Sequence, residues 1–326
     1  MKNNRICQIL GIEKPVIQGP LSWLTDARLV AAVSNAGGLG VLGPNAGLTA
    51  ETAVSTPEET AEKMREEIRK TKRLTEKPFG VNLIPTPEND IWTPPIMQVI
   101  KEEGVRAVVY TGYGEGAVIP GLFNELKEAG IAIIYRDINP TPENTRLAEE
   151  AGADIIVATG FDEGGTLPAT ALGTFSIVPL IADSVKTFRS WLQEVLLTIA
   201  LQKRHTPLVL KVCLPDRSSS VRKKAACRSL SKIKSLKPMV LICSFSVPCL
   251  ITIAHSRVNL PRSLLRWTKQ AQVMKSWVKQ WGGLRGLRIG MLEGNSDEGY
   301  IALGTGIGNI RCIKSVAEVV NELTVS

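Results

Sequence analysis

The sequence lacks the long apolar runs and the cysteine pairs that would place it in a membrane or in a disulfide framework. No run approaches the ~18 apolar residues that cross a bilayer, and the start, Met-Lys-Asn-Asn-Arg, has no apolar signal region. The six cysteines include no Cys-x-x-Cys pair. These absences predict a cytoplasmic protein with no membrane partner and no disulfide scaffold.

Glycine is missing from one long stretch. All 28 glycines lie outside residues 186–281, and this stretch carries 19 Lys and Arg against two acidic residues, Glu194 and Asp216. The remaining residues are acidic in balance, although the whole chain has a net charge of +8. The basic residues follow no helical stripe and accompany no nucleic-acid-binding motif, so we expect no nucleic-acid partner. The sequence divides into three zones, 1–185, 186–281 and 282–326.

The first zone alternates short apolar runs with helical patterns, which predicts six β-α units. Threonine followed by proline predicts helix starts at Thr56 and Thr141, and equally at Thr93. The expected strands are 15–21, 39–42, 79–84, 105–110, 131–135 and 154–158, and the expected helices are 26–35, 57–74, 94–103, 120–129 and 142–151, with a helix-like region at 169–172. Continuous apolar strands of this kind predict an α/β fold with a parallel sheet.

Two observations favour a (β/α)8 TIM barrel over a doubly wound sheet. The unusual residues follow the strands, at the end where barrel active sites lie. No Gly-x-Gly-x-x-Gly follows the first strand, as a dinucleotide-binding domain would show. Six β-α units are recognisable, and strands seven and eight are missing from the sequence as given.

Five segments carry distinctive motifs, namely VIQGPL at 16–21, AAVSNAGGLGVLG at 31–43, FGVNL at 79–83, ATGFDEGG at 158–165 and residues 286–319. Together they resemble the nitronate monooxygenase family, formerly 2-nitropropane dioxygenase, which includes the FMN-dependent enoyl-acyl-carrier-protein reductases. The resemblance covers roughly 1–185 and 282–323. It implies a flavoprotein monooxygenase that binds FMN and oxidises alkyl nitronates, small-molecule substrates, with reduced flavin and O2. The alternative is an enoyl-acyl-carrier-protein reductase with NAD(P)H as reductant, and a homo-oligomer is compatible with either.

The resemblance and the chemistry of the residues together predict a flavin site. A flavin needs backbone groups and side-chain amides along its ring and N–H groups around its phosphate. Alternatively, Gly19 and Pro20 only make a turn, and Asn82 caps the next helix. Glu293, Asp297 and Glu298 suggest a solvated loop, and we expect no metal site. The candidate cofactor-binding residues are Gln18, Gly19, Pro20, Asn82, Thr159, Gly160, Gly164, Gly165, Gly304 and Thr305.

Thr166 departs from the family pattern. The family loop usually ends Gly-Gly-His, and the resemblance implies that this histidine acts on the substrate beside the flavin. Here Thr166 stands at that position, and a hydroxyl does not accept a proton near neutral pH as imidazole does. Thr166 is the candidate catalytic residue, with a plain loop residue as the alternative reading.

The middle zone fits a translation of the gene in a shifted reading frame. With suitable synonymous codons, residues 187–195 read one base earlier give NIPVMAAGGI, and residues 201–214 give TAKAAYALGAEGVF. These resemble the missing seventh strand and a helix leading to the eighth. Lys186 fits a run of A and residues 281–283 fit a run of G, where single-base slips occur. The alternative is a genuine insertion.

The frame interpretation has a functional consequence. In the family, the seventh and eighth strands lead into loops that bind the FMN phosphate. A chain made as written lacks both, so we expect weak or absent FMN binding and poor solubility, because an incomplete barrel exposes a strand edge. A second class of function, an inactive basic protein that binds an anionic polymer, stays open.

Overall fold

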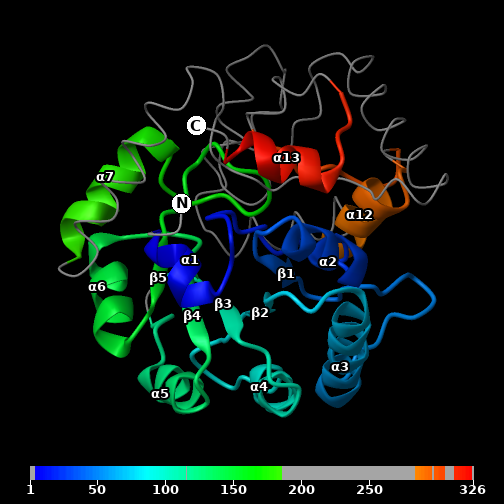
Figure 1. Ribbon diagram of the computed structural model, residues 1–326, viewed down its shortest axis with the longest axis horizontal. Helices are drawn as coiled ribbons and strands as arrows, with labels where there is room; N and C mark the ends of the chain where they lie inside the picture. Colours follow the sequence, from blue (N-terminus) through cyan, green and yellow to red (C-terminus); the bar gives the residue numbers. More distant parts are fainter. Residues whose placement is uncertain (1–3, 115, 186–282, 296, 305–311, 325–326) are drawn as a thin grey trace, which may run out of the picture.

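The computed structural model describes residues 4–114, 116–185, 283–295, 297–304 and 312–324 (Figure 1). Its centre is a five-stranded parallel sheet in the order β1-β2-β3-β4-β5. The strands are β1 (Gly40–Leu42), β2 (Phe79–Leu83), β3 (Ala107–Gly112), β4 (Ala132–Asp137) and β5 (Ile155–Val157). Each strand pairs with the next in the chain, so the expected parallel α/β sheet is confirmed.

A helix follows each strand and lies on the outer side of the sheet, as Figure 1 shows. These helices are α3 (Pro57–Leu74), α4 (Thr93–Glu102), α5 (Pro120–Glu128), α6 (Pro142–Ala151) and α7 (Thr174–Ser184), and α2 (Ala27–Asn35) precedes β1. The predicted bounds of α3 and α6 are confirmed to the residue. The helix-like region expected at 169–172 is wrong, because the helix begins at Thr174 after Gly173.

The first expected strand is reduced to a single parallel bridge between Ile17 and Leu39. Pro15 and Pro20 flank this segment and have no N–H to donate to a ladder. The strand predicted over 15–21 is therefore too long. The segment still lies beside β1, where the first barrel strand is expected.

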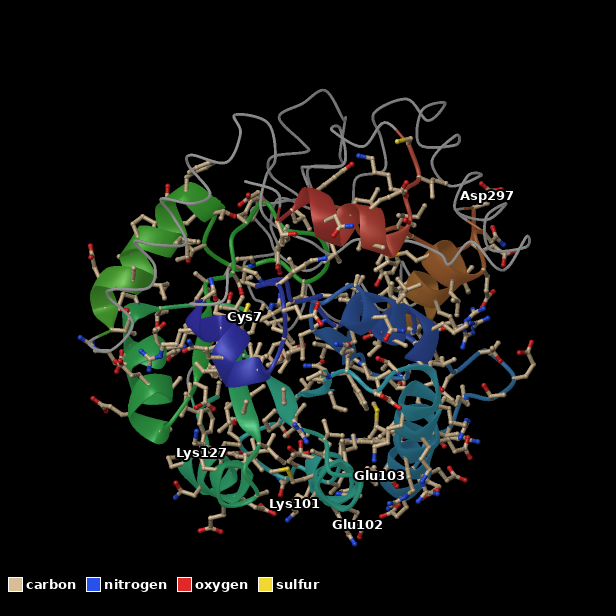
Figure 2. All side chains as sticks on the ribbon, in the orientation of Figure 1. Cys7, Lys101, Glu102, Glu103, Lys127 and Asp297 are labelled. Atoms are coloured by element: carbon tan, nitrogen blue, oxygen red, sulfur yellow. The ribbon has the colours of Figure 1, made fainter. Side chains whose placement is uncertain are left out.

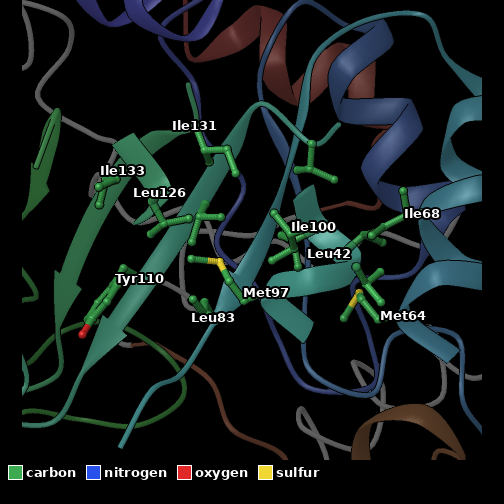
Figure 3. Close-up of a cluster of buried hydrophobic side chains, with 14 of the residues drawn as sticks. Leu42, Met64, Ile68, Leu83, Met97, Ile100, Tyr110, Leu126, Ile131 and Ile133 are labelled. Atoms are coloured by element: carbon green, nitrogen blue, oxygen red, sulfur yellow. The ribbon is translucent and has the colours of Figure 1, made fainter. Parts of the chain in front are cut away.

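The larger apolar core lies between the sheet and the outer helices. Alternate residues of each strand, such as Val81 and Leu83, belong to this core together with Met64 and Ile68 of α3. Figure 3 shows this cluster, with Tyr110 and Ile133 from β3 and β4 beside Leu126 of α5. Complete burial of these side chains contributes about 1.5–3 kcal/mol each to folding, which fixes the helices against the strands.

A second apolar core lies on the other face of the sheet. Val41, Val109 and Ile134 share it with side chains of α1 (Arg5–Leu10), including Cys7 and Leu10. Figure 2 places Cys7 near the centre of the fold. Burial raises the pKa of the Cys7 thiol, although the charge of the chain's amino terminus opposes the shift. We call this face the inner face.

The helix caps follow the sequence prediction at two of three Thr-Pro sites. The hydroxyls of Thr56 and Thr141 accept hydrogen bonds from backbone N–H groups of α3 and α6. Thr93 does not cap α4, so that expectation is wrong. Instead Oδ1 of Asp90 accepts from the backbone N–H groups of Trp92 at 3.0 Å and Thr93 at 2.9 Å. An aspartate three residues upstream reaches two free N–H groups at once, which a threonine hydroxyl at position 93 does not.

We expect Asp90→Ala to lower the free energy of unfolding by about 1 kcal/mol at pH 7, the usual worth of such a cap. Burial raises the pKa of Asp90, but hydrogen bonds from Thr93, Thr86 and Trp92 outweigh it, and the pKa lies below its ordinary 3.8. Because the folded-state pKa is depressed, the contribution is present above pH 3.8 and is lost as the pH falls through the folded-state pKa. Urea unfolding at pH 7 and below pH 3 measures it, and a difference that does not shrink in acid would contradict it.

The C-terminal zone returns to the start of the sheet. It contains α12 (Gly283–Leu287), a π-helical turn η2 (Arg288–Leu292) and α13 (Val316–Glu322), and α13 lies beside α2 (Figure 1). The guanidinium of Arg288 lies 5.3 Å from the ring centre of Trp23. Among the described helices none is long and apolar enough to span a membrane. The hypothesis of a shifted reading frame concerns residues 186–281, which lie outside the residues that the structure describes.

Candidate functional site

Polar side chains gather on the inner face where the strands end. Asn82 of β2, Thr111 of β3 and Arg136 of β4 lie on this face because they alternate with outward-facing apolar residues. The amide Nδ2 of Asn82 donates to the carbonyl of Val109 at 2.8 Å and to Oγ1 of Thr111 at 2.9 Å. Among the described residues, Oδ1 of Asn82 accepts no hydrogen bond. Asn82 therefore does not cap the next helix, and its amide joins β2 to β3.

Arg136 forms a buried ion pair with Glu163 from the loop after β5. The two side chains are 11% and 6% exposed, and Nη2 of Arg136 donates to Oε1 of Glu163. Charged groups are rarely buried at this level without a partner. Since the guanidinium has five N–H donors, this pair leaves donors of Arg136 for a further group.

Gln18 performs a structural task in this fold. Its Oε1 accepts from the N–H of Val41 at 3.1 Å, and its Nε2 donates to the carbonyls of Val41 at 3.3 Å and Gly19 at 2.5 Å. The side-chain amide thus takes the place of a peptide group and continues the parallel pairing that begins at Leu39. Gly19 and Pro20 follow it, both partly exposed, in the turn that leads toward α2.

The end of β5 leads into a tightly closed turn. Thr159 is 2% exposed, and its hydroxyl donates to the carbonyl of Asp137 at 2.6 Å. A side chain at Gly160 would meet Oγ1 of Thr174 at 2.5 Å and Oδ1 of Asp162 at 2.7 Å. The Asp162 carboxylate accepts from the backbone N–H and the hydroxyl of Thr174. Asp162 therefore caps α7 and fixes this turn.

The Gly-Gly loop after β5 packs directly against the C-terminal zone. A Cβ added to Gly164 would lie 2.7 Å from the backbone nitrogen of Gly304, and one added to Gly304 would lie 2.9 Å from that of Gly164. Gly165 has φ +105°, which favours glycine. Thr166 follows it and is half-buried. Thr305 lies outside the described residues.

We expect Gly164→Ala to lower the free energy of unfolding by about 1–3 kcal/mol, as overpacking does, because the added methyl group would meet backbone atoms that cannot rotate away. Gly121→Ala is the matched control, since nothing lies within 4 Å of a Cβ there. Thermal unfolding of both variants tests the contact. Equal melting temperatures for the two would contradict close packing of residue 164 against residue 304.

Sequence reasoning missed Arg136 and Glu163 and gave Thr111 no role. The signal was present for Arg136, since it stands two residues after the buried Ile134 and shares its face of the strand. Glu163 has no such signal, because its partner lies 27 residues earlier in the chain. In the part of the chain that the structure describes, no three His, Cys, Asp or Glu side chains gather as for a metal ion.

Comparison with known proteins agrees with this architecture. The family model described as nitronate monooxygenase matches residues 3–188, more than half of the chain. Two FabK structures from Thermotoga maritima, the second of them a mutant form, superimpose with TM-scores of 0.63 and 0.61 at 22% identity. Each superposition covers 98% of this chain, together with 94% of the first FabK chain and 95% of the mutant FabK chain. The likeness shows the (β/α)8 barrel fold.

Curated relatives match shorter stretches. The (3aS,4S,5R,7aS)-5-hydroxy-7a-methyl-1-oxo-octahydro-1H-indene-4-carboxyl-CoA dehydrogenase of Mycobacterium tuberculosis is 35% identical over 131 residues, 40% of this chain and 31% of the relative. The nitronate monooxygenase of Pseudomonas aeruginosa is 41% identical over 80 residues, 24% of this chain and 19% of the relative. The matches thus span less than a third of these relatives. On the evidence of the family model and the barrel architecture, this chain belongs to the nitronate monooxygenase family.

Proposed function

We propose that this chain is a flavin-dependent oxidoreductase that binds FMN at the carboxyl end of its strands. The observation that carries the proposal is the polar group formed by Asn82, Thr111, Arg136 and Glu163 on an inner face that is otherwise apolar. Family membership supports it, since the resemblance implies FMN for this family.

The residues present fit the ring of a flavin better than its phosphate. Asn82 offers Oδ1 as an acceptor, and Arg136 offers N–H donors beyond its pair with Glu163. These complement a ring edge that carries both N–H and C=O groups. Gln18 is a weaker candidate than the sequence suggested, because its amide is engaged with Val41. The loops expected to hold the phosphate lie outside the described residues.

When bound, FMN would supply two-electron redox chemistry. Asn82 and Arg136 would hold and orient the ring, and the apolar inner face below them would exclude water. Glu163 would keep Arg136 in place. Thr166, half-buried at the edge of the same loop, would contact the substrate by hydrogen bonding rather than by accepting a proton.

Among the finer activities, we favour oxidation of alkyl nitronates with reduced flavin and O2. A nitronate is already deprotonated, so its oxidation places the smallest demand on a proton acceptor at position 166, where this chain has threonine. NAD(P)H-dependent reduction of an enoyl thioester is the second candidate, and residues 1–185 would serve both.

An FMN titration of the full-length chain, followed by quenching of flavin fluorescence, tests the proposal. Because the expected phosphate loops are missing from the chain as written, we expect weak but saturable binding, and a further weakening of about tenfold in Asn82→Ala, the equivalent of one lost hydrogen bond of about 1.4 kcal/mol. Gln98→Ala, an exposed amide on α4, is the matched control and should bind as the parent does. Retention on heparin without any FMN binding would favour the basic, inactive protein instead.

Assays of the same preparation separate the two activities. Oxygen consumption with an alkyl nitronate supports monooxygenase activity, whereas oxidation of NAD(P)H that depends on an enoyl thioester supports the reductase. FMN binding without either activity would support the cofactor site and exclude both alkyl nitronates and enoyl thioesters as substrates.

A further inference from the structure

Asp137 is a buried carboxylate that faces away from the candidate site. It is the last residue of β4 and is 1% exposed. Since successive side chains of a strand point to opposite faces, Asp137 lies on the outer face while Arg136 lies on the inner one. A carboxylate at this depth needs strong hydrogen bonding.

Two loops at the carboxyl end of the sheet bind one oxygen of this carboxylate. Oδ1 of Asp137 accepts from the N–H of Gly114, in the loop between β3 and α5, at 3.1 Å. It also accepts from the N–H of Asn139, in the loop between β4 and α6, at 2.8 Å. Hydrogen bonds to a charged acceptor are stronger than those between neutral groups, so both loops are tied to the end of β4.

The second oxygen ties the same point to a strand and a helix. Oδ2 of Asp137 accepts from the hydroxyl of Tyr135 at 2.8 Å and from Nδ2 of Asn144 in α6 at 3.0 Å. Burial, and then the Asp137 charge, raise the pKa of Tyr135, so its hydroxyl stays a donor. The backbone carbonyl of Asp137 accepts from Thr159 at the end of β5. One residue thus joins four segments at the end of the sheet that carries the site.

We propose that Asp137 is a positioning residue of the candidate site, acting through Arg136 and Thr159. It fixes the end of β4, so that Arg136 reaches Glu163, and it holds the turn that begins at Thr159. The inference rests on the proposed function for its consequence in FMN binding, while the tethering of the loops stands on the contacts alone.

The test compares Asp137→Leu with Asp137→Asn by amide hydrogen exchange of the full-length chain without FMN. Leucine has a similar shape and accepts no hydrogen bond. Asparagine retains a carbonyl oxygen for Gly114 and Asn139, and its NH2 donates to Tyr135 and Asn144 once the Asn144 amide turns over. We expect exchange in segments 112–118 and 138–141 to accelerate about tenfold or more in the leucine variant, as local opening does. The asparagine variant should restore slow exchange.

Asp154→Leu is the matched control. Its carboxylate binds Lys127 and the N–H of Ile133 at the amino-terminal end of the strands, and Figure 2 shows Lys127 at the outer margin of the fold. We expect faster exchange near residue 133 and unchanged exchange in 112–118 and 138–141. Tyr135→Phe, which removes one donor to Oδ2, keeps the test decisive if the leucine variant does not fold. It should loosen the same segments to a smaller extent.

FMN titration of the same proteins reads out the consequence. The positioning role is supported if Asp137→Leu exchanges faster in the two segments and binds FMN about tenfold more weakly. In Asp137→Asn, both the exchange rates and the FMN affinity should return to those of the parent chain. Unchanged exchange in the two segments, equal acceleration throughout the chain, or loosening with unchanged FMN affinity would overturn it. If the parent chain binds no FMN, the proposed cofactor site fails, and the exchange pattern with its rescue by asparagine decides the role of Asp137.

Discussion

A gene with the reading frame restored should yield a yellow protein, whereas the chain as written should bind little FMN. The change adds one base in the A run at codon 186 and removes one from the G run at codons 281–283. The restored strand ends would donate hydrogen bonds to the phosphate, each worth about 1.5 kcal/mol or more. Since about 1.4 kcal/mol is tenfold in affinity, we expect bound flavin to rise by about tenfold or more. Absorbance near the flavin bands after gel filtration measures it.

The control is a gene with synonymous changes at codons 186, 282 and 283, which leave the frame as given. Equal FMN content in the restored and control proteins would contradict the frame interpretation. Resequencing of the DNA gives an independent answer, because A and G runs intact in the frame as given would exclude the two slips. The family model ends at residue 188, three residues into the glycine-free stretch, as both a frame shift and a genuine insertion would produce.

Arg136→Met should lower the free energy of unfolding by about 3–5 kcal/mol, the cost of leaving one partner of a buried ion pair uncompensated. Arg136 and Glu163 are only 11% and 6% exposed, so water cannot solvate the remaining carboxylate. Urea unfolding followed by circular dichroism measures the loss. We expect FMN affinity to fall with it, because the same guanidinium offers the donors toward the site.

The double variant Arg136→Met with Glu163→Met separates charge burial from packing. Replacing both partners by apolar side chains removes the uncompensated charge, so most of the lost stability should return. The control is Lys101→Met, which breaks an exposed pair with Glu125 at the surface of α4 (Figure 2). That variant should lose at most about 1 kcal/mol. A double variant no more stable than Arg136→Met would show that the loss comes from packing.

Local sequence signals accounted for most of the outer layer of this fold. The bounds of α3 and α6 follow from Thr-Pro starts and apolar periodicity, which act within one or two turns of chain. Where neighbouring residues compete, the predicted cap or strand does not form. Asp90, and not Thr93, caps the start of α4. The segment around Ile17 forms a single bridge because prolines flank it.

For the candidate site too, some features follow from the sequence and others from the tertiary structure alone. The sequence by itself determined the family, the parallel α/β class and Asn82 as a polar residue inside a buried strand, because these depend on short motifs and on strand periodicity. Only the tertiary structure decided that the Gln18 amide continues the pairing of β1, that Glu163 meets Arg136, and that Gly164 packs against Gly304. Each of these contacts joins segments more than 20 residues apart, and such pairings are set by how the strands are placed side by side.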